Sequence, residues 1–191
     1  MLYPVIYGSV RTERQGIRAA RYICREIEAR GHEARLVDPV EVDLPLLDRR
    51  RGEYPQGEAP EKMEALGQLI ERADGFVMVT GEYNHGIPPA LKNLLDHYLP
   101  EWYFRPAAIM SYSGGRYGGV RAAVQLRPVL GELGMASIST ILAVPSVSDA
   151  LAEDGTPKAD YLAKASGQFL DELDWWASAA KTQRAAAGTP F

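Results

Sequence analysis

The sequence predicts an α/β fold with a five-stranded parallel sheet. Short apolar runs alternate along the chain with longer segments in which apolar residues recur every three or four positions, which is the spacing of amphipathic helices. The apolar runs, most plainly residues 75–81, lack the polar–apolar alternation of a half-exposed strand. Such continuous runs are typical of parallel strands that helices cover on both faces.

The first third of the chain predicts a strand, a helix, a second strand and a long loop. An apolar, aromatic-rich run gives a strand over 3–7. A helix begins at Gly16, where apolar residues start to recur at helical spacing, and Gly31 ends it. A short strand is expected over 34–37. Residues 40–60 are rich in loop-forming residues and long for a connection in a compact domain, which is typical of a functional or partner-contacting loop.

The middle of the chain predicts helix, strand, helix and strand. A helix with one apolar stripe is expected over 61–73, and the buried strand 75–81 follows it. Pro88 and Pro89 mark the start of the next helix, because proline is favoured in the first helical turn. The fourth strand is expected over 107–113.

The last third predicts two helices with a strand between them. A helix over 120–133 follows a glycine-rich turn, and the fifth strand is expected over 137–144. The final helix is expected over about 158–180. The rest of the chain is rich in Ala, Gly, Thr and Pro, so we predict one domain over 1–180 and a frayed tail over 181–191.

Composition excludes several classes of protein. The chain has 191 residues, of which 46% are hydrophobic and 24% charged, so intrinsic disorder is not expected. The net charge of −4 argues against a nucleic-acid surface built on bulk positive charge. A single cysteine, Cys24, excludes an internal disulfide and a cysteine-cluster metal site. Neither a membrane span nor a signal peptide is evident, so a cytoplasmic protein is expected, with neither membrane nor nucleic acid as its partner.

The loop after the first strand has the features of an anion site. Ligands of open parallel sheets bind beyond the carboxyl ends of the strands. Here Ser9 and Arg11 precede the start of a helix, whose free N–H groups and dipole attract anions. The glycines match neither the dinucleotide fingerprint nor the P-loop, so a monophosphate is predicted. The alternative is a capped helix with solvated arginines.

The loops after the third and fourth strands fall at the same edge of the predicted sheet. Residues 81–89 offer the flat face of Tyr83 and polar groups for the edge of a heteroaromatic ring. His85 is a candidate base, but a lone histidine in a turn is more often a hydrogen-bonding residue, so we assign no catalytic side chain. The glycines of 113–122 let the backbone approach a ligand closely. The alternatives are a hydrophilic turn and a flexible loop.

One motif is rejected. Cys24 and Arg30 have the C-x5-R spacing of cysteine phosphatases. That chemistry needs a loop between a strand and a helix, whereas Cys24 lies on the apolar side of an expected helix. We therefore predict a buried structural thiol.

Four motifs follow one another along residues 5–144. They are Gly8-Ser9-Val10-Arg11; Leu44-Pro45-Leu46-Leu47-Asp48; Glu82-Tyr83-Asn84 with Ile87-Pro88 and Leu91-Lys92-Asn93; and Ser113-x-Gly115-x-x-Gly118-Gly119-x-Arg121-Ala122. In this order they resemble the NADPH-dependent FMN reductase family, the flavodoxin-like quinone, azo-dye and chromate reductases. The resemblance implies a flavodoxin-like three-layer sandwich, FMN as cofactor, and NADPH or NADH as co-substrate.

The resemblance also implies which residues bind FMN. The phosphate would be held by Ser9, Arg11, Gln15 and the amides of Gly16 and Ile17. The isoalloxazine ring would be lined, largely through backbone, by Glu82, Tyr83, Asn84 and His85. Its other edge would touch Ser113 and Gly115. The family usually has proline where this chain has Gly81, so a looser loop is expected here.

The activity that the resemblance implies is an NAD(P)H oxidoreductase. Hydride would pass from the nicotinamide to flavin N5, and then to a quinone, an azo compound, a metal oxyanion or free flavin. The alternatives are a flavodoxin-like electron carrier and a flavin-binding sensor, neither of which oxidises nicotinamide. From charge alone, the candidates for the NADPH phosphate are Arg14, Arg116 and Arg49–Arg51.

The resemblance further implies a homodimer or homotetramer. Residues 94–104 are rich in aromatics, and we predict that they form a subunit interface, where aromatic residues are enriched. The alternative is ordinary core.

Overall fold

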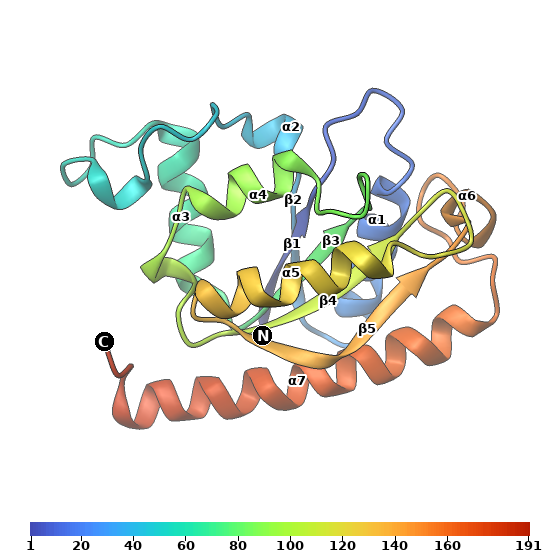
Figure 1. Cartoon of the computed structure of the whole chain (residues 1–191). Coiled ribbons are helices and arrows are strands. Elements are labelled where there is room, and N and C mark those ends of the chain that lie inside the picture. The colour runs from blue at the N-terminus through green and yellow to red at the C-terminus, as the bar shows by residue number, and fades with distance from the viewer.

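The computed structural model describes residues 1–191 and has three layers, with helices on both sides of one sheet (Figure 1). All five strands are parallel and lie in the order β2-β1-β3-β4-β5. Their bounds are β1 Leu2–Tyr7, β2 Glu33–Val37, β3 Phe76–Thr80, β4 Pro106–Tyr112 and β5 Ala136–Val144. The predicted five-stranded parallel sheet is confirmed, and each strand lies within two residues of its predicted bounds.

The strand order places three loops at one edge of the sheet. The chain leaves β1 for β2 and then returns to β3 on the other side of β1, so a switch point lies between β1 and β3. In the register of these strands, Tyr7 pairs with Val79 and Thr80 pairs with Ser111. The carboxyl ends of β1, β3 and β4 therefore lie side by side, and the loops that follow them project from the same end of the sheet (Figure 1).

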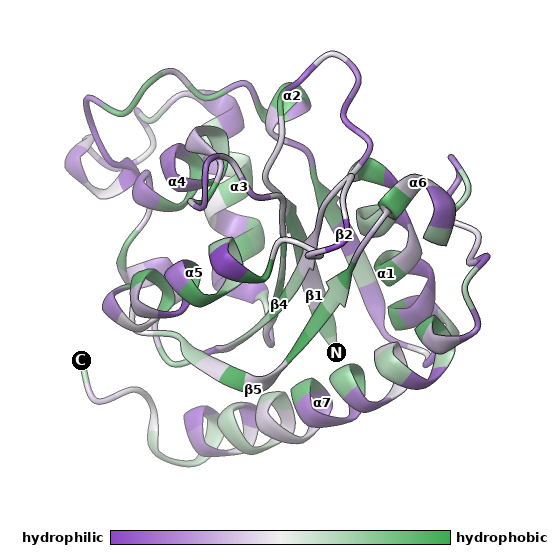
Figure 2. Ribbon diagram, turned by 45° about the vertical axis from the view of Figure 1, so that its right-hand side comes forward, coloured by the Kyte–Doolittle hydropathy of each residue, from purple (hydrophilic) through white to green (hydrophobic).

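Two apolar cores, one on each face, hold the helices to the sheet. One core joins the sheet to α1 (Ile17–Ala29), the short α6 (Val147–Ala150) and α7 (Tyr161–Ala187). The other joins it to α3 (Glu61–Arg72), α4 (Pro89–Asp96) and α5 (Val120–Glu132). Figure 2 shows apolar residues concentrated along the strands, while α1 and α7 carry both polar and apolar residues. This amphipathic pattern is why a helical period in the sequence gives the layered fold.

Three short helices interrupt the connections. They are α2 (Pro39–Val42) and the 3₁₀ helices η1 (Arg51–Glu53) and η2 (Pro100–Trp102). The 3₁₀ helix η1 lies within the predicted loop 40–60, and α2 begins one residue before it. No helix in the structure is both long and apolar enough to cross a membrane.

The last helix is longer than the sequence predicts. It continues to Ala187, so the expected end at Ala180 is wrong, and residues 181–187 are helical rather than frayed. Two contacts anchor this extension: Arg184 donates to the Phe104 carbonyl at 2.8 Å, and Lys181 pairs with Asp74 at 3.1 Å. Tertiary contacts thus order a stretch whose composition alone indicated a tail.

Part of the aromatic segment 94–104 is buried within the chain. His97, Tyr98 and Trp102 are fully or almost fully buried within a single chain. Trp102 packs edge-on against Phe76, with ring centroids 4.9 Å apart. For these three side chains the structure favours the alternative, ordinary core, because side chains that the chain itself buries have no surface left for a partner. Tyr103 and Phe104 are half-buried, and for them the subunit interface stays a prediction.

Cys24 lies within α1 and is half-buried. Burial raises the pKa of its thiol to about 12, so little thiolate forms near neutral pH. The predicted structural role fits this environment, and the phosphatase reading does not.

Candidate functional site

The loop after β1 begins at Gly8, whose N–H donates to the Val79 carbonyl at 3.1 Å and extends the pairing of β1 with β3. Beyond Gly8, several hydrogen-bond donors of the loop have no partner. The side chains of Arg11 and Gln15 are exposed and make no hydrogen bond. No side chain caps α1, and the N–H of Gly16 donates to no protein group. The N–H of Ile17 makes only a long contact of 3.3 Å with the Arg14 carbonyl. These groups together are suited to an anion.

Ser9 joins the first loop to the second. It is 2% exposed, and its hydroxyl lies 2.9 Å from the hydroxyl of Tyr83. The same hydroxyl accepts a weak bond from the Arg11 N–H at 3.4 Å. The structure therefore brings Ser9, Arg11 and Tyr83 together. This agrees with the prediction that the loops after the first and third strands lie at the same end of the sheet.

Arg14 is occupied within the protein. It forms an ion pair with Asp38, which is 4% exposed, and its guanidinium lies 5.6 Å from the ring centre of Tyr7. It also donates to the Ser9 carbonyl at 3.3 Å. The hydrogen bond to Asp38 raises the pKa of Arg14. Arg14 thus clamps the first loop to the end of β2, and its charge is not free for the NADPH phosphate.

Arg51 is also neutralised. It pairs with Glu64 at 2.8 Å, with Glu101 at 2.9 Å, and with Glu71. These carboxylates, Glu64 first, raise the pKa of Arg51, and in return Arg51 lowers the pKa of Glu64 to about 2. Arg51 therefore ties the 40–60 loop to α3 and η2, and it is not available to bind a phosphate.

The loop after β3 forms a tight two-residue turn. The N–H groups of Tyr83 and Gly86 each donate to the other's carbonyl at 2.9 Å. Asn84 and His85 between them both have positive φ, 50° and 68°, which is the geometry of a type I′ turn. Their side chains are exposed at its tip, and His85 makes no hydrogen bond. A histidine without a carboxylate partner is not arranged as a general base.

The loop after β4 is held by its own serine. The Ser113 hydroxyl donates to the Gly115 carbonyl at 2.7 Å and accepts from the Gly118 N–H at 2.9 Å. Gly114 and Gly115 are exposed, and a Cβ at either position would meet no atom within 4 Å. The backbone here is therefore open to a ligand.

An aromatic side chain in this loop packs against two arginines. The guanidinium groups of Arg116 and Arg121 lie 4.9 and 4.6 Å from the ring centre of Tyr117. Arg121 is neutralised by Glu82 at 3.0 Å, and this ion pair joins the second loop to α5. Arg116 has no carboxylate partner and donates only to the Tyr117 hydroxyl at 2.8 Å.

Sequence reasoning missed two contributors to this edge. Asp38 follows the second strand and holds Arg14, and Tyr112 ends β4 beneath the loops. A usable signal existed for Asp38, because Asp-Pro at a strand end predicts a helix cap, and its carboxylate does accept from the Val40 N–H at 3.0 Å. No pattern in the sequence marks Tyr112.

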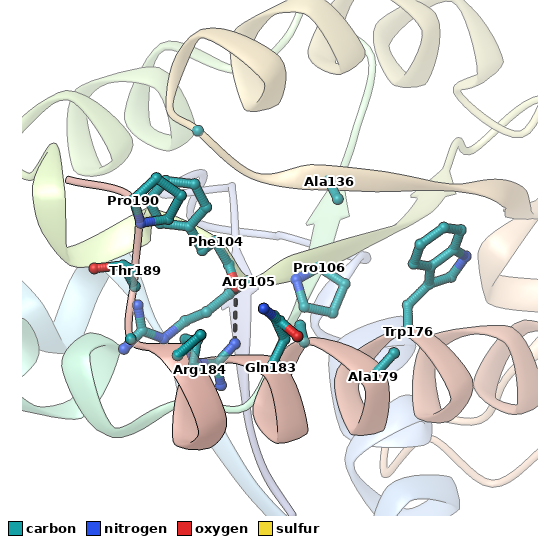
Figure 3. A pocket seen from close by; sticks show the side chains of 14 residues that line it. Phe104, Arg105, Pro106, Ala136, Trp176, Ala179, Gln183, Arg184, Thr189 and Pro190 are labelled. Atoms are coloured by element: carbon teal, nitrogen blue, oxygen red, sulfur yellow. Dashed lines mark hydrogen bonds between the residues drawn. The ribbon is translucent and has the colours of Figure 1, made fainter.

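A cavity of about 500 Å³ lies at the opposite edge of the sheet (Figure 3). It is bounded by the last turns of α7 and by the residues that begin β4 and β5, including Phe104, Pro106 and Ala136. None of the predicted FMN residues lines it. Its size falls in the range of small-molecule sites, but its place does not match the rule for ligands of parallel sheets.

Comparison with known proteins identifies the family. The model of the NADPH-dependent FMN reductase family matches residues 1–149. The NAD(P)H-dependent FMN reductase LOT6 of Saccharomyces cerevisiae is 32% identical over 171 residues, which cover 81% of this chain and 86% of that protein. An NAD(P)H-dependent FMN reductase of Schizosaccharomyces pombe is 40% identical over 116 residues, 57% of each chain. A quinone reductase of Escherichia coli is 39% identical over 97 residues. The chain thus spans only about half of the length of the last two relatives, 57% and 50%.

Solved structures agree with these matches. FerB, a flavoenzyme NAD(P)H:(acceptor) oxidoreductase from Paracoccus denitrificans, superposes with a TM-score of 0.74 at 26% identity, over 93% of this chain and 97% of that one. A flavodoxin from Pseudomonas aeruginosa superposes with a TM-score of 0.57 at 20% identity, over 95% and 99% of the two chains. The predicted flavodoxin-like fold is confirmed, and the chain belongs to the NADPH-dependent FMN reductase family.

Proposed function

We propose that the protein is an FMN-dependent NAD(P)H oxidoreductase that reduces a small acceptor. The observation that carries the proposal is the meeting of three family loops at the carboxyl edge of the sheet, where their exposed donors and open backbone face no protein partner. Family membership supports FMN as the cofactor and NAD(P)H as the reductant.

The first loop would hold the FMN phosphate. Ser9, Arg11 and Gln15 would contribute side chains, and Gly16 and Ile17 would contribute amides. Support comes from the unpaired side chains of Arg11 and Gln15 and from the uncapped start of α1. A phosphate there would supply the acceptors that these donors lack and would lie at the positive end of the helix dipole.

The other two loops would hold the isoalloxazine ring. The turn formed by Glu82, Tyr83, Asn84 and His85 is rigid because two backbone hydrogen bonds close it. Glu82 is neutralised by Arg121, so its carboxylate would not repel an electron-rich ring. Ser113 and Gly115 would approach the other edge of the ring, where the open backbone at Gly115 leaves room.

The chemistry would be that of the cofactor. When bound, FMN would supply the redox chemistry that links oxidation of NAD(P)H to reduction of the acceptor, with hydride transfer at its N5 atom. The residues of the chain would bind and orient the ring, and backbone N–H groups would stabilise negative charge on it. No side chain is placed as an acid–base partner, since His85 is exposed and unpaired.

The acceptor is a small molecule in this proposal. A quinone reductase from Escherichia coli and an NADPH azoreductase from Bacillus sp., the latter 34% identical over 119 residues, are both relatives. Quinones and azo compounds are therefore the first acceptors to assay. An electron carrier without nicotinamide oxidation is the second candidate, and the likeness to a flavodoxin favours it only at the level of fold.

A homo-oligomer in the cytoplasm completes the proposal. Val10, Val40 and Leu46 are large apolar residues with 54%, 51% and 86% of their surface exposed. Val10 also lines a small cavity together with Leu44 and Ala90. Such exposed apolar surface near the first loop supports a subunit contact, which light scattering tests directly: a monomer at micromolar concentration would contradict it.

An anaerobic absorption experiment tests the central claim. The protein is mixed with FMN, freed of excess flavin, and titrated first with NADPH and then with a quinone. We expect flavin bands that bleach with NADPH and return with the quinone. Bound flavin that NADPH does not bleach would favour the electron carrier, and the absence of bound flavin would refute the proposal.

A further inference from the structure

One buried residue lies against all three loops of the candidate site, through its ring in the first two and through its backbone in the third. Tyr112, the last residue of β4, is 8% exposed. A Cβ at Gly16, in the first loop, would lie 1.9 Å from the Cζ atom of its ring. A Cβ at Gly81, at the start of the second loop, would lie 3.1 Å from the same atom. In the third loop, a Cβ at Gly119 would lie 2.5 Å from the Tyr112 carbonyl oxygen.

The three glycines therefore mark close approaches of backbone to a single residue. Distances of 1.9 and 2.5 Å leave no space for any side chain at Gly16 or Gly119. At Gly81 the fit is tight, and a methyl group would require the ring to shift. The Tyr112 ring thus fills the space between the backbone of the first loop and that of the second.

The ring is itself held in place. Its hydroxyl donates to the Tyr7 hydroxyl at 3.5 Å, and the two ring centres lie 6.3 Å apart. Arg14 packs against Tyr7 and donates to the Ser9 carbonyl, so the same cluster extends to the first loop. Burial raises the pKa of Tyr112, which keeps the hydroxyl protonated as a donor.

We propose that Tyr112 is the positioning residue that sets the spacing between the phosphate subsite at Gly16 and the turn that holds the flavin ring. The inference rests on the proposed function, because it assumes that these loops bind FMN. Tyr112 would touch no reacting atom. Its role would be to keep two subsites at the separation at which one FMN molecule satisfies both.

The ratio of FMN to riboflavin affinity measures this spacing. Riboflavin has the same ring as FMN but no phosphate, so it reports on the ring subsite alone. We expect Tyr112→Leu to lower the affinity for FMN about tenfold or more, and that for riboflavin less than about threefold. Tyr112→Phe retains the ring and should keep the ratio within about threefold of wild type. Flavin fluorescence quenching gives both dissociation constants.

Gly16→Ala provides a second and independent variant. Its new methyl group would displace the Tyr112 ring, so it should lower the same ratio even if Tyr112→Leu does not fold. In the Tyr112→Leu background the methyl group meets a smaller side chain, and the effect of Gly16→Ala should shrink markedly. Such non-additivity is the signature of two residues that act through one contact.

Tyr98→Leu is the matched control. Tyr98 is 1% exposed, lies in the other core and donates to the Met63 carbonyl at 3.0 Å. The Tyr98→Leu variant should be less stable than wild type but should have the same ratio of FMN to riboflavin affinity. Equal losses for both flavins in Tyr112→Leu and Gly16→Ala, or no loss in either, would overturn the inference. A wild-type protein that does not prefer FMN over riboflavin would instead refute the proposed phosphate subsite.

Discussion

The two ends of the parallel strands differ in cavity volume and in unpaired hydrogen-bond donors. The end at which the strands begin, here called the amino edge, has the cavity of about 500 Å³, with Arg105 and Arg184 in its lining (Figure 3). Both arginines donate to backbone carbonyls: Arg105 to those of Glu71, Ala73, Glu101 and Tyr103, and Arg184 to that of Phe104. At the carboxyl edge, the side chains of Arg11 and Gln15 are exposed and donate to no protein group.

Unpaired hydrogen-bond donors therefore favour the carboxyl edge as the ligand site, although the larger volume of the two lies at the amino edge. A donor that already serves the protein offers little to a ligand, because binding would only exchange one partner for another. A donor left free at a helix start gains a partner when an anion arrives. The comparison therefore favours a structural role for Arg105 and Arg184, and it supports the proposed phosphate contact of Arg11.

Arg105→Met should give the largest effect, and it should be on stability alone. The change would leave four carbonyls without their donor, including two at the end of α3. We expect a loss of about 3 kcal/mol in the free energy of unfolding, a fall in Tm of roughly 6–12 °C. Thermal denaturation followed by circular dichroism measures it. If FMN affinity fell at the permissive temperature while Tm stayed constant, the contrast between the edges would be broken.

Arg11→Ala should give the reverse pattern. The side chain is exposed and unpaired, so its loss should change Tm by less than about 2 °C. Without its charge, FMN affinity should fall about tenfold to a hundredfold, the usual value of a charge-assisted hydrogen bond. Arg21→Ala is a matched control on the outer face of α1, where Arg21 donates only to the Glu153 carbonyl. Equal FMN affinities for the two variants would argue against a phosphate contact at Arg11.

Arg116→Ala tests which arginine of the carboxyl edge binds the NADPH phosphate. Of the arginines considered for the NADPH phosphate, Arg14 and Arg51 are neutralised by carboxylates, whereas Arg116 is held only by Tyr117. We expect its loss to lower the preference for NADPH over NADH about fivefold, mainly through KM, with FMN affinity unchanged. Arg49, which packs on Tyr54 at 4.9 Å, is the control. A preference that changes only in the Arg49→Ala variant would move the phosphate subsite to the 40–60 loop.

The sequence predicts the strands and loops of the carboxyl edge well because local patterns encode them. Continuous apolar runs mark the strands, and glycines such as Gly8, Gly81 and Gly114 mark where the loops after them begin. Local patterns do not predict the partner of each charged side chain, because the two partners can lie far apart in the sequence. Asp38 lies 24 positions after Arg14, and nothing local to either residue predicts their ion pair.

The departures from prediction at the amino edge have the same origin. The Ala-rich end of α7 has the composition of a tail, but Ala is also the best helix former, and the contacts of Lys181 and Arg184 with distant residues decide the outcome. His97, Tyr98 and Trp102 are chemically suited to either an interface or a core. Only their burial in the folded chain, with Trp102 packed against Phe76 of β3, shows that they belong to the core.

Acid should lower the stability of the fold by a small amount, because it protonates a carboxylate that joins α7 to β5. Glu172 in α7 accepts bonds from the N–H groups of Ser139 and Thr140 on β5, at 2.8 and 2.9 Å. Burial alone would raise its pKa, but these bonds and the side-chain hydroxyls outweigh burial and lower the pKa to about 2 from 4.5. A carboxyl with a lowered folded-state pKa stabilises the fold above its unfolded pKa, and this stabilisation is lost as the pH falls.

Glu172→Gln tests that prediction. In wild type, this contribution should be complete above about pH 5 and fade between about pH 4.5 and 2. Solvent screening limits it to about 1 kcal/mol, or roughly 2–4 °C in Tm. The difference in Tm between wild type and Glu172→Gln should therefore shrink as the pH falls through this window, while the FMN-to-riboflavin ratio at pH 7 is the same in both proteins. A difference that stays constant from pH 7 to pH 3 would show that the carboxylate charge of Glu172 contributes nothing, and that the two N–H groups on β5 need only a neutral acceptor.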